Sequence, residues 1–221
     1  MAKLIWDKVG ERLYETGVDK VVLFPQESNG SYANGVAWNG VTGVTESPSG
    51  AETTAVYADN AKYLNLISAE ELGATIEAYM SPEEFDACDG TAELAGGITI
   101  GQQTRQKFGL CYRTKIGNDT ENADHGYKIH ILYNCTASPS EKGYSTINDS
   151  PEAMTLSWTV STTPVDVEGH KPTALVTIDS TKVKPATLKA IEDKLYGTAD
   201  TEATLLTPVE IVALVATLEA A

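Results

Sequence analysis

The most constraining feature of the sequence is the stretch from Thr104 to Ile116, TRQKFGLCYRTKI, because its residue types alternate with a period of two. Side chains along a β-strand point to opposite faces of the sheet in turn, so this alternation predicts a strand with one buried face. The even positions carry the apolar side chains Phe108, Leu110, Tyr112 and Ile116. The odd positions carry the four cations Arg105, Lys107, Arg113 and Lys115. We therefore expect a long, half-buried strand with a positively charged outer face.

Two further stretches, Tyr127 to Cys135 and Met154 to Thr162, repeat this alternation. Three such strands, joined by polar connectors that contain glycine, predict an antiparallel sheet with one dry and one wet face. His130 falls on the wet parity, so we expect an exposed strand residue there rather than a proton shuttle. The predicted fold class is mainly β with flanking α, built on a β-sandwich or barrel-like core.

Length and charge limit the possible functions. The chain has 221 residues, a length that β-rich domains reach without dividing, so we expect one domain with extensions. It carries 16 Lys and Arg against 31 Asp and Glu, a net charge of −15. Proteins that grip nucleic acid neutralise phosphates with Lys and Arg, so this balance argues against a DNA-binding protein. It does not argue against a protein past which DNA must slide.

The charges are also unevenly distributed along the chain. Between Leu64 and Thr104 there are eight acids and no Lys or Arg, and the cation-rich strand follows directly. Two interpretations stay open: the acidic and basic blocks pair within one chain, or they form a self-complementary surface between chains. The acids are Glu70, Glu71, Glu77, Glu83, Glu84, Asp86, Asp89 and Glu93.

The three cysteines, Cys88, Cys111 and Cys135, are widely spaced and include no C-x-x-C pair. This usage is typical of free, mostly buried thiols in a reducing compartment, and spacing alone cannot establish a bridge between Cys111 and Cys135. The N-terminal residues lack the apolar core of about 7–15 residues of a signal peptide. No stretch approaches the roughly 20 apolar residues of a membrane span. We expect a soluble protein made in a cytoplasm.

Local signals place further strands and turns. Val36 to Thr45 is expected to form a tight hairpin around Asn39-Gly40, and Ser47 to Ala51 is expected to break the strand pattern. Glu52 to Leu66 predicts a protruding hairpin with its tip at Asp59-Asn60, because β-branched residues and Tyr favour strands whereas Asp and Asn favour turns.

A short helix is predicted at Pro82 to Cys88, after a strand at Gly73 to Met80. Ser81 would be its N-cap, followed by proline and two acids in the first turn. Phe85 would face inward from this helix. The glycine-rich stretch Ala95 to Gly101 leads towards a strand, so it predicts a turn rather than a phosphate-binding loop.

The C-terminal part predicts a strand at Ala174 to Ile178 and helices at Pro185 to Tyr196 and Pro208 to Leu218. These elements either pack against the main sheet or form an arm that docks on a neighbouring molecule. We divide the chain into a β-sandwich domain at residues 1–166 and a strand and helix extension at 167–221 that is not an independent domain.

No catalytic or cofactor-binding motif assembles in the sequence. His125, His130 and His170 are separated by loops, and no H-E-x-x-H or Cys/His cluster offers metal-ligand spacing. There is neither a G-x-S-x-G elbow nor a P-loop. We therefore expect no enzyme, no cofactor and no metal site. Ala137 to Pro151 is long and polar, which makes it a candidate exposed or functional loop.

Five sequence blocks spread over residues 9–166 carry a family resemblance: GERLYETGVDKVVLFP, SPSGAETTAVYADNAKYLNL, GATIEAYMSPEEFDACDG, FGLCYRTKIGND and NDSPEAMTLSWTVSTTPV. Together they resemble the major tail proteins of long-tailed, non-contractile bacteriophages of the siphovirus type. The resemblance implies a β-sandwich flanked by the helix at Pro82 to Cys88. Copies of such a protein assemble into rings, expected to be hexameric, which stack into a tail tube.

The resemblance also implies partners and a location. The partners would be other copies of the chain, the tape-measure protein inside the tube, the tail terminator and distal-tail proteins, and double-stranded DNA that passes without specific binding. No membrane insertion is expected. The protein would be synthesised in the cytoplasm of a bacterial host and would end in the virion tail.

Candidate interface residues follow from the resemblance and the charge pattern. The protruding hairpin would reach an adjacent ring through Tyr57, Asp59, Asn60 and Lys62. The cations Arg105, Lys107, Arg113 and Lys115 would line a DNA channel poorly, so we expect them at a subunit contact or paired with the acidic block.

Two other classes stay open. A tube protein of a contractile tail or a secretion-like machine differs in having a sheath around the tube. A monomeric β-sandwich that binds carbohydrate would need an exposed aromatic platform, whereas Trp38, Trp158 and most tyrosines fall on apolar parities.

Overall fold

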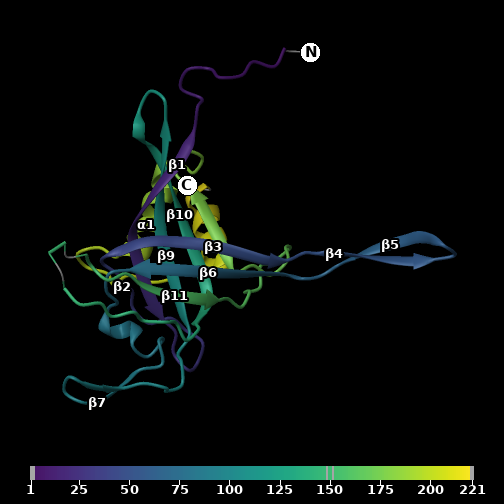
Figure 1. Ribbon diagram of the computed structural model, residues 1–221. Helices are drawn as coiled ribbons and strands as arrows, with labels where there is room; N and C mark the ends of the chain where they lie inside the picture. Colours follow the sequence, from purple (N-terminus) through teal and green to yellow (C-terminus); the bar gives the residue numbers. More distant parts are fainter. Residues whose placement is uncertain (1–2, 148, 151, 220–221) are drawn as a thin grey trace.

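The computed structural model of the chain describes residues 3–147, 149–150 and 152–219. Its main feature is a hydrogen-bonded sheet of 8 strands in the order β2-β1-β9-β10-β11-β6-β3, with β12 also paired to β10. The order ends at β2 and β3, so the described strands form an open sheet rather than a closed barrel. The sheet folds into two layers with helices behind them (Figure 1). The expected class, mainly β and sandwich-like with flanking helix, is confirmed.

The first layer is built on β9 and β10 and runs vertically in Figure 1. Its strands are β1 (Tyr14–Pro25), β2 (Val36–Ala37), β9 (Phe108–Asn118), β10 (Asn122–Ala137) and β12 (Leu175–Asp179). The second layer runs across it in the same view. Its strands are β3 (Val41–Gly50), β6 (Glu70–Ala78) and β11 (Leu156–Ser161).

Hairpins and helices complete the fold. The longer hairpin, β4 (Thr53–Ala58) with β5 (Ala61–Ile67), extends far from the second layer (Figure 1). The shorter hairpin, β7 (Ala92–Ala95) with β8 (Ile98–Ile100), lies at the lower end of the molecule in the same view. The turn expected at the glycine-rich stretch joins β7 to β8. The helical segments are η1 (Glu83–Phe85), α1 (Pro185–Tyr196) and α2 (Pro208–Glu219).

An aromatic core fills the space between the two layers. Phe85 is fully buried at its centre, with its ring centroid 4.5 Å from that of Trp38 and 5.3 Å from those of Phe108 and Trp158. Both tryptophans therefore lie inside the sandwich, as their parity predicted. Burial of these large rings contributes much of the hydrophobic stabilisation of the fold.

A second core lies on the other face of the first layer. Cys111 and Ile131 of that layer pack with Ile191 and Leu195 of α1. We predicted that one face of these strands would be exposed to solvent. This prediction is wrong for the middle of the first layer, because helices cover that face. His130 is also only 9% exposed rather than an exposed strand residue, since it stacks on Tyr112 towards the second layer.

The predicted hairpin at Val36 to Thr45 is wrong. Val36 and Ala37 pair with β1, whereas the residues after Asn39-Gly40 enter β3 and pair with β6. Trp38 explains the crossover: its backbone N–H donates to Val21, and its buried indole N–H donates to the carbonyl of Met80. We also predicted that the strand would break at Ser47 to Ala51. Instead β3 continues to Gly50, so this prediction is wrong for all but the last residue of the stretch.

The helix predicted at Pro82 to Cys88 is only a single 3₁₀ turn, Glu83–Phe85, within a short turn region. Ser81 does not cap it, since Pro82 occupies the N-cap position without a side-chain hydrogen bond. The inward positions of Phe85 and Cys88 are confirmed. The helices that cover the first layer come instead from the C-terminal part of the chain.

The two C-terminal helices lie close to their predicted positions, and β12 forms the predicted strand. All three cysteines are buried and free, as predicted. Within the described residues, no helix is long and apolar enough to cross a membrane.

Candidate assembly surfaces

The hairpin β4–β5, which we call the arm, is almost entirely exposed and extends far from the body of the molecule (Figure 1). Ala58 pairs with Ala61 across its tip, and Asp59 and Asn60 take left-handed φ angles of 51° and 61°. Such a two-residue turn suits Asp and Asn, which tolerate this region better than other residues with side chains. The predicted protruding hairpin and its tip are confirmed.

The arm continues a strand pair of the second layer. The pairing of β3 with β6 runs to Gly50 opposite Glu70, and the arm begins at Thr53 opposite Ile67. The backbone hydrogen bond from Ser68 N to Glu52 O, at 3.1 Å, bridges the junction. One two-stranded ribbon thus runs from the core of the molecule to the tip of the arm.

The arm exposes apolar side chains that a monomer leaves in water. Val56 lies opposite Leu64, and Leu66 lies opposite Thr54 on the same face of the ribbon. Tyr57 and Tyr63 are about equally exposed, at 70% and 71%. A two-stranded hairpin has two open edges and is only marginally stable alone in water, so pairing and apolar burial against another surface would stabilise it.

Four of the predicted interface residues lie together on the arm. Tyr57 pairs with Lys62, and the tip residues Asp59 and Asn60 come between them in the chain. The structure therefore brings these residues into one small surface. Their contact with another molecule remains a prediction.

The four predicted cations do not share one face of a strand, because β9 begins only at Phe108. Arg105 lies in the preceding loop, where its guanidinium donates to Asp89 at 3.2 Å and to the carbonyl of Ala137 at 3.1 Å. Lys107 is exposed in the same loop, whereas Lys115 is half-buried on β9.

Arg113 has a partner within the chain that the sequence pattern did not indicate. Its guanidinium makes two hydrogen bonds of 2.7 Å to the carboxylate of Asp19 on β1. These hydrogen bonds lower the pKa of Asp19 against the opposing effect of burial. The same guanidinium lies 4.9 Å from the ring centroid of Tyr127. The geometry gives Arg113 a role in joining β1 to β9, and its role between subunits remains a prediction.

The two interpretations of the acidic block can be compared with these contacts. Asp89 pairs with Arg105 and also accepts a hydrogen bond of 2.6 Å from Lys142. Arg113 instead pairs with Asp19, which lies outside the block. Asp89 of the acidic block is thus paired with Arg105 of the predicted cations within the same chain, as the first interpretation expects at this position.

The outer face of the second layer is polar and contains no Lys or Arg. Register pairs such as Thr45 with Thr75 and Thr75 with Thr159 place its side chains on one face. Glu71 and Glu77 are its acids. The face consists of Gly43, Thr45, Ser47, Ser49, Glu71, Gly73, Thr75, Glu77, Ser157, Thr159 and Ser161.

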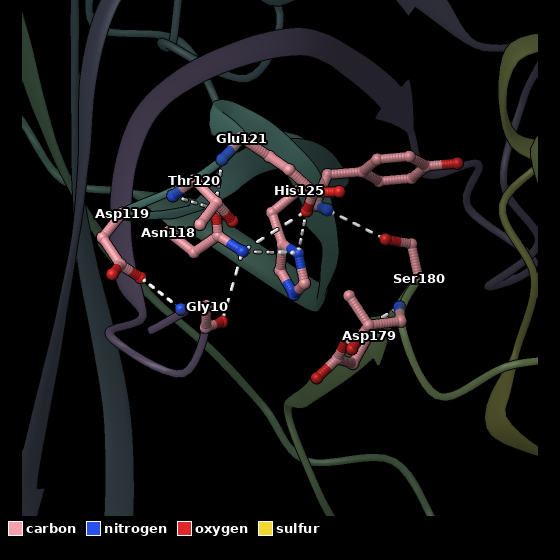
Figure 2. A network of polar contacts seen from close by, with 10 residues as sticks. Gly10, Asn118, Asp119, Thr120, Glu121, His125, Asp179 and Ser180 are labelled. Carbon is pink, nitrogen blue, oxygen red and sulfur yellow. Dashed lines mark hydrogen bonds and ion pairs between the residues drawn. The ribbon is translucent and has the colours of Figure 1, made fainter. Parts of the chain in front are cut away.

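An N-terminal segment forms a second projection that sequence reasoning missed. Trp6 is 74% exposed, and the segment is fixed to the hairpin between β9 and β10 at Gly10. Gly10 N donates to Asp119 at 2.9 Å, and Asn118 donates from its side chain to Gly10 O at 3.3 Å (Figure 2). The apolar run Leu4-Ile5-Trp6 was the available signal, but it has no periodicity that would place it on an element.

The buried Asn118 organises this anchor. Its Oδ1 accepts hydrogen bonds from the backbone N–H groups of Thr120 and Glu121, which closes the turn between the strands (Figure 2). Within the part of the chain that the structure describes, no group of three or more His, Cys, Asp or Glu residues could hold a metal ion.

Together these features define a mainly β protein with two sheet layers, helices on one face and a projecting two-stranded arm. No protein-family model and no curated protein matches the chain. Among solved structures, it is similar to a chain of the baseplate of the anti-feeding prophage, determined by cryo-EM with 6-fold symmetrisation. That match covers 81% of this chain and 100% of the other, at 12% identity and a TM-score of 0.36. A likeness at this level carries no argument about function.

Proposed function

We propose that the chain is the major tail protein of a long-tailed, non-contractile bacteriophage, a structural subunit whose copies form stacked rings. The observation that carries this proposal is the arm, which extends beyond the body of its own subunit with apolar side chains and open strand edges. An element of this kind is suited to contact with another copy. The family resemblance of the sequence supports the same function.

In this proposal the arm joins one ring to the next. Burial of Val56, Leu64 and Leu66 against the neighbouring ring supplies the apolar part of the contact. The pattern is heterologous, because the arm of one subunit meets a different surface of the next, and such contacts build rings and tubes. The expected ring is a hexamer.

The tube encloses the tape-measure protein and later conducts double-stranded DNA, and it ends at terminator and distal-tail proteins. We assign the outer face of the second layer to the channel. Phosphate groups are held mainly by Lys and Arg, and this face has neither, whereas Glu71 and Glu77 repel a polyanion. The opposite side of the molecule is covered by α1 and α2.

Negative-stain electron microscopy of the purified protein across a concentration series tests the proposal. Rings or tubes with a central channel are expected. In the double variant Leu64→Ser/Leu66→Ser, tube formation should require at least a tenfold higher concentration, because burying a leucine contributes about 1.5–3 kcal/mol. Asn65→Ser is the matched control, since Asn65 lies between them on the opposite face of the ribbon.

Two results would contradict the proposal. Folded wild-type protein that remains as single small particles at every concentration would remove the self-assembly role. Tubes that form equally well in the double variant and the control would leave the tube but remove the arm from its contacts.

A further inference from the structure

The chain contains three Asn-Gly dipeptides, at Asn29-Gly30, Asn34-Gly35 and Asn39-Gly40. Asparagine is a chemically labile residue, and it is most labile before glycine. The reason is that the backbone nitrogen of the next residue can attack the side-chain amide carbon, and glycine has no Cβ to hinder the approach. All three asparagines are exposed, so exposure alone does not rank them. The hydrogen bonds of the three glycine nitrogens do.

Two of these glycine nitrogens are held by hydrogen bonds to distant or neighbouring carbonyl groups. Gly30 N donates to the carbonyl of Glu27 at 2.9 Å. Gly35 N donates to the carbonyl of Ala203, also at 2.9 Å. Gly35 is enclosed as well, since a Cβ at its position would lie 2.6 Å from the ring of Phe24. Attack by either nitrogen therefore requires that the backbone first opens and gives up a hydrogen bond.

Gly40 differs from the other two glycines. Within the described residues its N–H has no hydrogen-bond partner, although its carbonyl accepts a hydrogen bond of 2.9 Å from Tyr79 N. Gly40 is exposed, and a Cβ at its position would meet the Cβ of Tyr79 at an ordinary contact distance of 3.8 Å. The nitrogen beside Asn39 is thus open to solvent and needs no hydrogen bond to break before it reacts.

We propose that Asn39 is a site of spontaneous deamidation in the folded subunit, whereas Asn29 and Asn34 are protected. The nitrogen of Gly40 forms a bond to Cγ of Asn39, and the bond from Cγ to the amide nitrogen breaks. Ammonia leaves with the proton that the Gly40 nitrogen has lost, and a cyclic imide remains. Solvent water then opens the imide at either of its two carbonyl groups. The products are aspartate and isoaspartate, each with a carboxylate in place of the amide.

The position of Asn39 gives this reaction a structural consequence. Asn39 lies in the turn through which the chain crosses from β2 of the first layer to β3 of the second. Trp38 N fixes one side of the turn by its 2.9 Å hydrogen bond to the carbonyl of Val21. Isoaspartate adds a methylene group to the main chain at this point, and both products add a negative charge. Deamidation therefore alters a connection between the two layers, and this inference does not depend on self-assembly.

Mass spectrometry of the folded chain after prolonged incubation in mildly alkaline buffer tests the proposal. Peptide fragmentation assigns the conversion to each asparagine, with aspartate and isoaspartate counted together. Asn39 should convert at least about fivefold faster than Asn29 or Asn34, because only those two sites must first open a hydrogen bond. In guanidinium chloride, where the chain is unfolded, the three sites should convert at similar rates. Conversion of Asn39 in the folded chain that is no faster than at the other two sites would overturn the proposal.

Ammonia release by two variants gives an independent measurement. In Asn39→Gln the side chain is longer by one methylene group and cyclises far more slowly, so the folded variant should lose more than about half of the ammonia release. Asn34→Gln is the matched control, since position 34 is equally exposed and precedes a glycine whose nitrogen is held. This control should release ammonia almost as fast as the original chain. Equal release by Asn39→Gln and Asn34→Gln would contradict the assignment to Asn39.

Discussion

Gly50, at the junction of β3 and the arm, provides a sensitive test of how the arm is held. Its φ is +80°, and a Cβ at this position would overlap the carbonyl oxygen of Ala69, which lies between β5 and β6. The left-handed conformation alone costs a residue with a side chain about 1–2 kcal/mol. The overlap in Gly50→Ala adds to this cost, because only a shift of the backbone can relieve it.

A matched control separates these two costs. Gly97, in the turn between β7 and β8, has a φ of +75°, and nothing lies within 4 Å of the position that its Cβ would take. Gly97→Ala therefore carries the conformational cost without the overlap. The difference between the two variants measures the close approach of the strands at the root of the arm.

Amide hydrogen exchange followed by NMR is the assay. In Gly50→Ala we expect the junction bonds to open more often, namely Ala51 N to Ala69 O at 3.3 Å and Ser68 N to Glu52 O at 3.1 Å. A loss of about 2 kcal/mol in local opening free energy corresponds to roughly 30-fold faster exchange. Equal exchange of the Ala51 and Ser68 amides in Gly50→Ala and Gly97→Ala would refute this reasoning.

Three further predictions concern the body of the subunit. Phe85→Ala should lower the free energy of unfolding, measured in urea, by about 3–5 kcal/mol, because Phe85 is fully buried. The control Glu84→Ala, at an exposed neighbouring position, should change it by less than about 0.5 kcal/mol. Similar losses in the two variants would contradict the packing argument. Arg113 lowers the pKa of Asp19 in the folded state. The pair should therefore stabilise the fold, by less than about 1 kcal/mol, at any pH above the pKa of about 3.9 that Asp19 has in the unfolded chain. This contribution should be lost as the pH falls through the lower pKa of Asp19 in the folded protein. Acid titration of stability should therefore be shallower in Asp19→Asn, and an unchanged slope would be evidence against the pair. Burial raises the pKa of Cys111 to about 12, so iodoacetamide at pH 8 should modify it only after unfolding, and mass spectrometry of native protein showing modification would contradict this.

The sequence predicted the elements whose signals are local. Trp158 and Val160 are buried in the core and alternate with exposed residues along β11, as their parity predicted. The proline at position 185 and the glycine at 197 bound α1, where a helix can begin and end. The arm was also predictable, since Asp59-Asn60 forms its turn without help from the rest of the chain.

Prediction failed where distant segments decide the structure. The Asn39-Gly40 signal favours a hairpin, but Trp38 is drawn into the core between the layers and separates the two strands. Parity could not reveal that α1, which comes about 75 residues later in the chain, covers the face of Cys111. Parity also gave no sign of the partner of Arg113 within the chain, because Asp19 is 94 positions away; the interface role of Arg113 stays a prediction.

The long strand β10 has a mechanical consequence for the subunit. It pairs with β9 along most of its length and with β12 over its middle, and beyond the left-handed Asn134 its last two residues, Thr136 and Ala137, pair with β11. A force applied along the arm therefore passes through β3, β6 and β11 into β10. From β10 it reaches β9 and β12, the strands against which α1 packs. Load on a docked arm is therefore shared by hydrogen bonds throughout the main sheet.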